Sequence, residues 1–251
     1  EVATYIPELG RANPDDFGIA LVAADGGEVF KAGQWDRPFT IQSISKPFTF
    51  GLAIETFGAE HVSRHVGVEP SGDAFNAIEL QNGTNKPFNP MVNSGAITIT
   101  ALLHQRFGAD TFDAILERMS QAAGHPLVVD ESVYDSERRT GHRNRAIAHL
   151  LLNFGLVHDE AEAALDVYFR QCAILVTSQD LATMGATLAN MGRHPETNLP
   201  VYDLQATRAM LAIMFTCGMY DYSGEWAYRV GVPAKSGVAG GVMAVVNRQL
   251  G

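Results

Sequence analysis

Short apolar runs near both ends of the chain predict β-strands. The runs 17–24 and 28–32 flank the triplet Asp25-Gly26-Gly27, and two apolar runs around a glycine turn are typical of a β-hairpin. Further short strands are predicted at 39–41, 225–232 and 240–246. The strands therefore fall into one group at the start of the chain and one group at its end.

Between about 60 and 216 the chain is predicted to be helical, with polar connections. Helices are predicted at 91–105, 110–122, 142–153, 160–176, 178–191 and 204–215. The segment 43–54 is predicted as a helix buried on most sides, because apolar residues such as Phe48, Leu52 and Ile54 surround it. The segment 69–89 is rich in Gly, Pro and Asn and predicts a long loop, a kind of segment that is more often functional than not.

This order of elements predicts an α/β protein of the α+β type. Strands from both chain ends would form one antiparallel sheet (1–42 plus 222–251), with a mainly helical part (43–221) between them. We find no internal repeat or linker, so we expect a single catalytic domain over 1–251, with a site between the sheet and the helical part.

Composition narrows the class of protein. Hydrophobic residues make up 46% and charged residues 18%, as in ordinary globular enzymes and binding proteins. The 18 basic and 28 acidic residues give a net charge of −10, which argues against nucleic acid or an anionic membrane as a partner. Since no stretch reaches about 18 apolar residues, we expect no membrane span.

The cysteines and the chain ends bear on the compartment. Cys172 and Cys217 lie on separate predicted helices without zinc or CxxC spacing, and we interpret them as buried free thiols of a reducing, cytoplasmic and bacterial setting. The sequence has neither an initiator Met nor a signal peptide, so we expect both ends to have been trimmed.

The first chemical motif is Ser43-Ile44-Ser45-Lys46. If a helix begins here, Ser43 and Lys46 share a face, because residues three apart in a helix are neighbours. A partly buried lysine with a lowered pKa can take the serine proton, and this S-x-x-K arrangement occurs in penicillin-binding proteins and serine β-lactamases. The alternative is an ordinary helix start, with Ser43 as the N-cap and Lys46 solvated. Pro47 fits either interpretation but disfavours α geometry at Lys46.

The second motif is Lys235-Ser236-Gly237, about 190 residues later. It is similar to the K-T-G triplet that lines the cleft opposite the nucleophile in penicillin-recognising enzymes, with Ser in place of Thr. Alone it is more typical of a surface turn; paired with Ser43 and Lys46, it favours a catalytic interpretation. The glycines that flank Val238 would let a backbone amide approach a substrate closely.

Metal and nucleotide sites are not supported. His61 and His65 have the i, i+4 spacing of zinc ligands, but no HExxH motif or third ligand accompanies them, so a solvated helix face is the better interpretation. Neither a GxGxxG motif after a strand nor GxxxxGK[ST] occurs. We therefore expect no cofactor and no metal.

Taken together, the motifs resemble those of the serine-dependent glutaminases, which share the β-lactamase/penicillin-binding-protein-like fold. The matching stretches occur in the family's order over nearly the whole chain: 5–9 (YIPEL), 42–46 (QSISK), 89–97 (NPMVNSGAI), 136–138 (SER) with Gly141, Arg143 and Asn144, 168–169 (YF), 217–221 (CGMYD) and 235–241 (KSGVAGG). Family members usually have more residues at both ends, and those pieces hold a further strand and a covering helix, so the resemblance implies a sheet that looks incomplete here.

The resemblance implies an amidohydrolase that converts L-glutamine to L-glutamate and ammonia. Ser43 would be the nucleophile that forms a γ-glutamyl ester, and Lys46 its base. Tyr220 would relay a proton to the leaving amine, and the backbone amides of Ser43 and Val238 would form the oxyanion hole.

The resemblance also implies a set of substrate-binding residues. Glu137 would pair with the α-ammonium group, while Asn93, Asn144 and Tyr168 would bind the α-carboxylate. Tyr5 would close one wall, and Gln42 would support the nucleophile. The family forms dimers and tetramers, so a homo-oligomer is implied.

Two alternatives stay open at this point. A penicillin-interacting serine hydrolase would share Ser43, Lys46 and Lys235, but it needs an S-D-N or Y-x-N element, which we do not find. A non-catalytic binding domain on the same fold would be expected to have lost the Ser–Lys pair, which is intact here.

Overall fold

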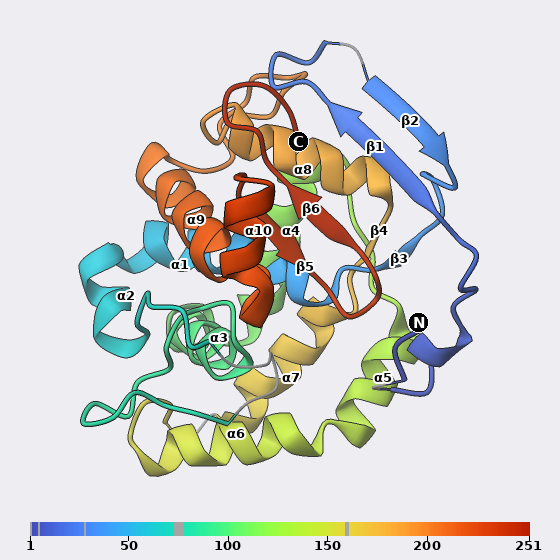
Figure 1. Ribbon diagram of the computed structural model, residues 1–251. Helices are drawn as coiled ribbons and strands as arrows, with labels where there is room; N and C mark the ends of the chain where they lie inside the picture. Colours follow the sequence, from blue (N-terminus) through green and yellow to red (C-terminus); the bar gives the residue numbers. More distant parts are fainter. Residues whose placement is uncertain (1, 5, 28, 73–77, 159–160) are drawn as a thin grey trace.

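The computed structural model describes residues 2–4, 6–27, 29–72, 78–158 and 161–251. Over these residues the protein is mixed α/β, mostly helical with small sheets (Figure 1). The α-helices are α1 (Lys46–Phe57), α2 (Ala59–His65), α3 (Asn93–Phe107), α4 (Thr111–Ala123), α5 (Glu131–Thr140), α6 (His142–Asn153), α7 (Ala161–Cys172), α8 (Ser178–Ala189), α9 (Leu204–Cys217) and α10 (Ser223–Arg229). Short 3₁₀ turns are η1 (Leu9–Arg11), η2 (Gln42–Ser45), η3 (Gly108–Asp110) and η4 (Tyr220–Tyr222).

Helix α1 forms the centre of the core. It packs against α3, α4 and α9, and its residues from Lys46 to Ile54 are all buried. A helix that is apolar on most sides is expected to be surrounded in this way, so the sequence pattern of this segment predicts its position correctly. A second apolar cluster, with Ile97, Leu151 and Phe169 among its members, joins α3 to α6 and α7. The first cluster contains Phe48 at the start of α1, and the second contains Ala96 and Ile97 near the start of α3, so each cluster holds one of these two helix starts in place.

The strands form three two-stranded antiparallel sheets among the described residues. They are β1 (Gly18–Val22) with β2 (Val29–Gly33), β3 (Phe39–Thr40) with β4 (Leu175–Val176), and β5 (Ala234–Ser236) with β6 (Val242–Ala244). The hairpin β1–β2 confirms the turn predicted at 25–27 and packs on α8. The chain end returns to β1, where Val22 and Gly251 exchange two backbone hydrogen bonds of 2.9 Å.

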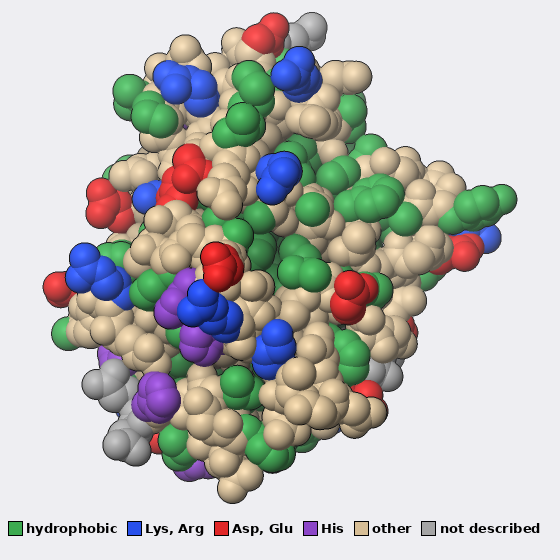
Figure 2. All heavy atoms as spheres, turned by 90° about the vertical axis from the view of Figure 1, so that its left-hand side faces the viewer, with side chains coloured by type: hydrophobic (Ala, Val, Ile, Leu, Met, Phe, Trp, Pro, Cys, Tyr) green, Lys and Arg blue, Asp and Glu red, His purple; other side chains and the backbone are tan. Residues whose placement is uncertain are grey.

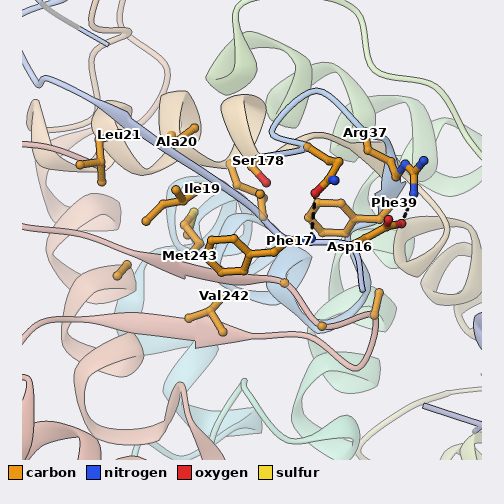
Figure 3. Close-up of a pocket in the computed structure, with 18 of the residues that line it drawn as sticks. Asp16, Phe17, Ile19, Ala20, Leu21, Arg37, Phe39, Ser178, Val242 and Met243 are labelled. Carbon is orange, nitrogen blue, oxygen red and sulfur yellow. Dashed lines mark hydrogen bonds and ion pairs between the residues drawn. The ribbon is translucent and has the colours of Figure 1, made fainter. Parts of the chain in front are cut away.

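The expected single sheet from both chain ends therefore differs from what the structure shows. Strands β1 and β6 do not pair, because they lie on opposite walls of a groove of about 640 Å³. Figure 3 shows this groove with Ile19 and Leu21 on one wall and Val242 and Met243 on the other. The ladder edges of β1 and β6 that face the groove are too far apart to hydrogen-bond to each other.

The prediction of a strand at 225–232 is wrong. Residues Ser223–Arg229 form the short helix α10, and the Trp226 indole N–H donates to the Val232 carbonyl oxygen at 2.8 Å. An i, i+4 ion pair between Glu225 and Arg229 supports the helix. Aromatic and β-branched residues favoured a strand here, but their tertiary contacts determine the outcome. The nearby strand is β5, which contains Lys235 and Ser236 of the second motif. The sequence pattern predicts this segment as a connection between two strands.

Most helix predictions are confirmed, with two exceptions. The helix predicted at 160–176 ends at Cys172, after which the chain forms β4 beside β3. Helix α5 was missed because its sequence is mostly polar, and only Val133, Ser136 and Glu137 are buried. An amphipathic stripe that narrow is hard to find in a sequence without knowing which face packs.

Surface charge, helix hydropathy and the positions of the histidines and cysteines can be compared with the predictions. On the face shown in Figure 2, acidic and basic side chains are interspersed instead of gathered by sign. Among the described residues, none of the helices combines the length and hydropathy that a membrane span requires. The same part of the chain contains no group of three or more potential metal-ligating side chains. The rings of His61 and His65 are neighbours in a tilted arrangement, with centroids 5.0 Å apart. Both cysteines are free and buried, as predicted.

The close contact between α1 and α9 gives a testable prediction at Gly51. A Cβ atom there would overlap the Met210 sulfur and lie 2.9 Å from the Tyr202 ring. We expect Gly51→Ala to lower the free energy of unfolding by about 1–3 kcal/mol, measured by urea denaturation. The control is Gly224→Ala in exposed α10, where a Cβ meets nothing within 4 Å and should leave stability unchanged or slightly higher. Equal stability of the two variants would contradict this interpretation of the α1–α9 contact.

Candidate active site

Ser43 lies on a 3₁₀ turn that leads directly into α1. The turn η2 covers Gln42–Ser45 and α1 begins at Lys46, which has α-helical backbone angles (φ −57°, ψ −45°) even though Pro47 follows. In a 3₁₀ turn, side chains three residues apart eclipse each other, so Ser43 and Lys46 lie on the same side. Ser43 is only 6% exposed. The predicted Ser–Lys arrangement is thus built by a 3₁₀ turn and not by a regular helix start.

The residue before Ser43 carries backbone strain. Gln42 has φ +49°, a left-handed conformation that non-glycine residues rarely adopt and that tends to persist at functional sites. A chain of buried side chains supports it: Gln171 Nε2 on α7 donates to Ser45 Oγ at 2.9 Å, and that hydroxyl donates to the Gln42 carbonyl oxygen at 2.6 Å. Sequence reasoning named Gln42 but missed Ser45 and Gln171, because contacts between distant elements leave no local pattern.

Lys46 is a buried amine whose partners are uncharged oxygens. Its Nζ donates to the Met91 carbonyl oxygen at 2.9 Å and to Asn93 Oδ1 at 2.7 Å. The side chain is 1% exposed, and burial lowers the pKa of Lys46 to about 7, slightly opposed by the Cys172 thiol. Since a nearby carboxylate would raise this pKa again, the uncharged partners keep the amine available as a base near neutral pH.

Tyr220 faces both buried lysines. The Lys46 Nζ lies 5.8 Å from the centroid of its ring, and the Lys235 Nζ lies 3.9 Å from it. Burial raises the pKa of Tyr220, and a hydrogen bond with the Ser43 side chain partly opposes that rise, so the phenol stays protonated at neutral pH. Like Gln42, Tyr220 has a left-handed backbone (φ +56°). Tyr220 therefore joins the two parts of the site: its side chain contacts that of Ser43, and its ring faces the amines of Lys46 and Lys235.

Lys235 extends from β5 toward the same place. Its amine is fully buried and donates to the carbonyl oxygens of Gly218 (3.0 Å) and Ser236 (2.7 Å). Burial, together with repulsion from Lys46, lowers the pKa of Lys235 well below its ordinary value. Gly218 has no room for a side chain, since a Cβ would overlap the Ala234 carbonyl oxygen. The turn before Tyr220 and strand β5 are thus held together partly by the Lys235 amine.

The end of β5 lies against the nucleophile turn. A Cβ on Gly237 would come 3.1 Å from the Ile41 carbonyl oxygen and 3.2 Å from Ile44, so this close approach favours glycine. Val238 follows and packs, partly buried, on a small apolar cluster that includes Ile6 and Val133. The predicted second motif is therefore brought next to Ser43, as expected.

Three further predicted residues form one polar network with Lys46. Asn93 Nδ2 at the start of α3 donates to Asn144 Oδ1 on α6 at 3.0 Å, and the Tyr168 hydroxyl on α7 reaches Asn93 Oδ1 at 3.4 Å. All three side chains are buried. Asn93 Oδ1 also accepts from Lys46, so the network extends directly from the amine.

Glu137 is a buried carboxylate on the same side of the molecule. Its side chain, on α5, is only 2% exposed. Burial, together with the charge of the Glu137 carboxylate, raises the pKa of the Cys172 thiol to about 12. The Cys172 thiol in turn interacts with Lys46. The Glu137 carboxylate is therefore linked electrostatically to Lys46 through the Cys172 thiol. Tyr5, the remaining predicted site residue, lies outside the described residues.

The groove between β1 and β6 does not coincide with this site. The groove between β1 and β6 in Figure 3 is lined mainly by apolar side chains such as Leu21 and Met243, and none of the residues gathered around Ser43 lines it. We place the candidate site by its chemistry instead. The Ser43 hydroxyl, the Tyr220 phenol that contacts it and the buried Lys46 amine that faces the phenol ring are the kinds of group that acyl transfer needs.

Comparisons with known proteins agree with this chemistry. The family model described as "Glutaminase" matches residues 1–251. The chain is 56% identical over 251 residues to "Glutaminase 2" of Bradyrhizobium diazoefficiens and 52% identical over 250 residues to "Glutaminase" of Trichormus variabilis. It is covered in full in both cases but spans only 40% of the Bradyrhizobium protein and 75% of the Trichormus protein.

Solved structures give the same result. A crystal structure described as Mglu in its glutamate form superposes on the whole chain with a TM-score of 0.93 and 43% identity, and the match covers 58% of that chain. A structure described as a probable glutaminase, YbaS, has a TM-score of 0.93 and 40% identity over the whole chain, and the match covers 81% of the YbaS chain.

The support of the nucleophile turn gives a testable prediction. We expect Ser45→Ala to lower the free energy of unfolding by about 1–3 kcal/mol, because it leaves the buried Gln171 amide without its acceptor. The double variant with Gln171→Leu should lose less than the sum of the single variants, since both polar partners are then gone. Urea unfolding of the three variants checks this. Strict additivity would show that the pair does not act as a unit.

Proposed function

Because the chain belongs to the glutaminase family, a family of amidohydrolases, we propose that it hydrolyses the side-chain amide of L-glutamine to L-glutamate and ammonia. The observation that carries the proposal is the Lys46 amine, buried beside uncharged oxygens with a pKa of about 7, on the same side of the turn as Ser43. Such an amine can take the proton of a serine hydroxyl at neutral pH.

In the proposed reaction Ser43 Oγ attacks the amide carbon while its proton passes to Lys46. The resulting oxyanion is stabilised by the backbone amides of Ser43 and Val238, where each donor contributes about 3–4 kcal/mol in comparable sites. Tyr220, which contacts Ser43, relays a proton to the nitrogen, and the C–N bond breaks to release ammonia. A water molecule then attacks the γ-glutamyl ester, gives its proton back through the same groups, and frees glutamate and Ser43.

The surrounding polar residues suit a free amino acid. The buried Glu137 carboxylate would pair with the α-ammonium group, which offsets the cost of keeping that charge buried. Asn93, Asn144 and Tyr168 would donate to the α-carboxylate; Asn93 has a second amide hydrogen beyond the one bonded to Asn144. Gln42 would support the nucleophile and Tyr5 one wall. The homo-oligomer, which the resemblance implies, stays a prediction. The cytoplasmic location, which was inferred from the cysteines, stays a prediction too.

The experiment that tests the function compares two substrates. We expect the protein to release ammonia from glutamine in a coupled assay and to leave a chromogenic cephalosporin intact. Ser43→Ala should lower kcat for glutamine by at least about a thousandfold, because the other hydroxyl on the turn, that of Ser45, is fully buried and bonded to Gln42 and Gln171. Turnover of glutamine by this variant at the parent rate would remove Ser43 as the nucleophile, and cephalosporin hydrolysis would favour the penicillin-interacting alternative.

The pH dependence follows from the pKa of Lys46. Below about pH 7 the amine carries a proton and cannot accept another from Ser43, so kcat/KM should rise with pH and level off above an inflection near 7. Initial rates between pH 5.5 and 9 measure this. Lys46→Arg keeps the positive charge at every pH and should abolish both the activity and the inflection. A flat profile across pH 7 in the parent enzyme would contradict Lys46 as the base.

A further inference from the structure

The position of the Lys46 amine depends on a short segment that precedes α3. Both of its hydrogen-bond acceptors come from there: the carbonyl oxygen of Met91 at 2.9 Å and the side-chain oxygen of Asn93 at 2.7 Å. A carbonyl oxygen on an irregular segment stays in place only if something fixes the peptide that carries it. The Met91 peptide must therefore be held by other groups.

Asn89 fixes it through both ends of its side-chain amide. Asn89 Oδ1 accepts hydrogen bonds from the backbone N–H groups of Met91 (3.0 Å) and Val92 (3.3 Å), while Nδ2 donates to the Glu69 carbonyl oxygen at 2.9 Å. The residue is 1% exposed. Asparagine is suited to this role, because it joins an acceptor for successive backbone amides to a donor for a distant carbonyl.

The backbone around Asn89 is packed as closely as its side chain. The Asn89 carbonyl oxygen lies against Gly95 in the first turn of α3, where a Cβ would overlap it. The Ala96 N–H donates to the Val92 carbonyl oxygen at 3.0 Å, which continues the helix back to the same segment. The segment is therefore anchored to α3 on one side and, through Glu69, to the preceding loop on the other.

We propose that Asn89 is a positioning residue for the base: its side chain fixes segment 89–93 so that Met91 and Asn93 hold the Lys46 amine toward Ser43. The proposal rests on the proposed function for its catalytic meaning. Asn89 bonds to Glu69, Met91 and Val92 and to none of the groups expected to react or to bind glutamine, so it acts through segment 89–93. A neutral amine has two N–H groups and one lone pair. When Met91 and Asn93 accept from the two N–H groups, the lone pair at the remaining tetrahedral position of Nζ can take the serine proton.

Other groups around Lys46 are not altered by this segment. The titratable groups that face the amine are Cys172 on α7, Tyr220 on η4 and Lys235 on β5. None of them belongs to segment 89–93 or bonds to Asn89. A change at Asn89 therefore alters the hydrogen bonds of Lys46 without removing any of these charges.

The test is a titration of Lys46 that does not depend on activity. The chain contains only four lysines (Lys31, Lys46, Lys86 and Lys235), so the side-chain NMR signal of Lys46 in ¹³C-lysine-labelled protein can be assigned by its loss in Lys46→Arg. In Asn89→Ala the Met91 carbonyl is released, and loss of one hydrogen bond that favours the ammonium form should lower the pKa of Lys46 by about one unit. We expect kcat to fall between about tenfold and a hundredfold with KM for glutamine within about threefold.

Two further variants separate positioning from folding. Asn89→Ser keeps an oxygen for one backbone amide but cannot reach Glu69, so its pKa and kcat should lie between those of the parent and of Asn89→Ala. Thr187→Val removes a buried hydroxyl that donates to Ala122 at 3.1 Å between α8 and α4. It should lower the thermal midpoint yet leave the Lys46 pKa and kcat unchanged.

Each outcome is decisive. If the pKa of Lys46 in folded Asn89→Ala equals that of the parent, or moves as much in Thr187→Val, the proposal is wrong. If Asn89→Ala does not fold, the Ser variant carries the same comparison, and parent-like pKa and kcat there would overturn the proposal. If the parent releases no ammonia from glutamine while the graded pKa shifts are found, the proposed function fails but the positioning of Lys46 stands.

Discussion

The structure keeps two amines buried without carboxylate partners among the described residues, and the rest of the site depends on this arrangement. Lys46 and Lys235 are both almost completely inaccessible to solvent, and removal of an ammonium group from water is costly unless its charge is paired or lost. Here carbonyl and amide oxygens satisfy the N–H groups, which compensates for hydration but not for charge. The pKa of each amine falls as a result, and burial thus gives Lys46 the pKa of about 7 that the proposed role as a base requires.

The second amine lies close to the first. Lys235 faces the same Tyr220 ring as Lys46, and its pKa is lowered by burial and by repulsion from Lys46. The ring faces stabilise whichever amine is charged, while the Tyr220 hydroxyl contacts Ser43. A protein that merely needed buried packing would place apolar side chains at these positions with less cost. The retention of two lysines and a phenol around one serine is therefore best explained by proton transfer.

The sequence predicted the parts of this site better than their supports. Ser43, Lys46 and Lys235 stood in short motifs, and the structure brings them together as expected. The contacts of Asn89, Gln171 and Gly218 could not be predicted, because they join elements far apart in the chain and follow no period. The same limit explains the errors in the fold: 225–232 has strand-like composition but its contacts make it helical, and α5 buries too few apolar residues to show a pattern. Pro47 argued against α geometry at Lys46, yet Lys46 adopts it because the preceding 3₁₀ turn is held independently.

Strain marks the two places where the site must be rigid. Gln42 and Tyr220 both adopt left-handed backbone angles, one directly before the nucleophile and the other at the phenol that contacts it. Each such residue costs about 1–3 kcal/mol and persists only where surrounding contacts over-determine it. Those contacts are identifiable: the Gln171–Ser45 bonds hold the Gln42 carbonyl, and Lys235 holds the Gly218 carbonyl two residues before Tyr220. Lys235, whose own pKa is lowered by burial and by repulsion from Lys46, would thus also fix the turn that presents the phenol, so a substitution of Lys235 would change the electrostatics and the geometry of this site together.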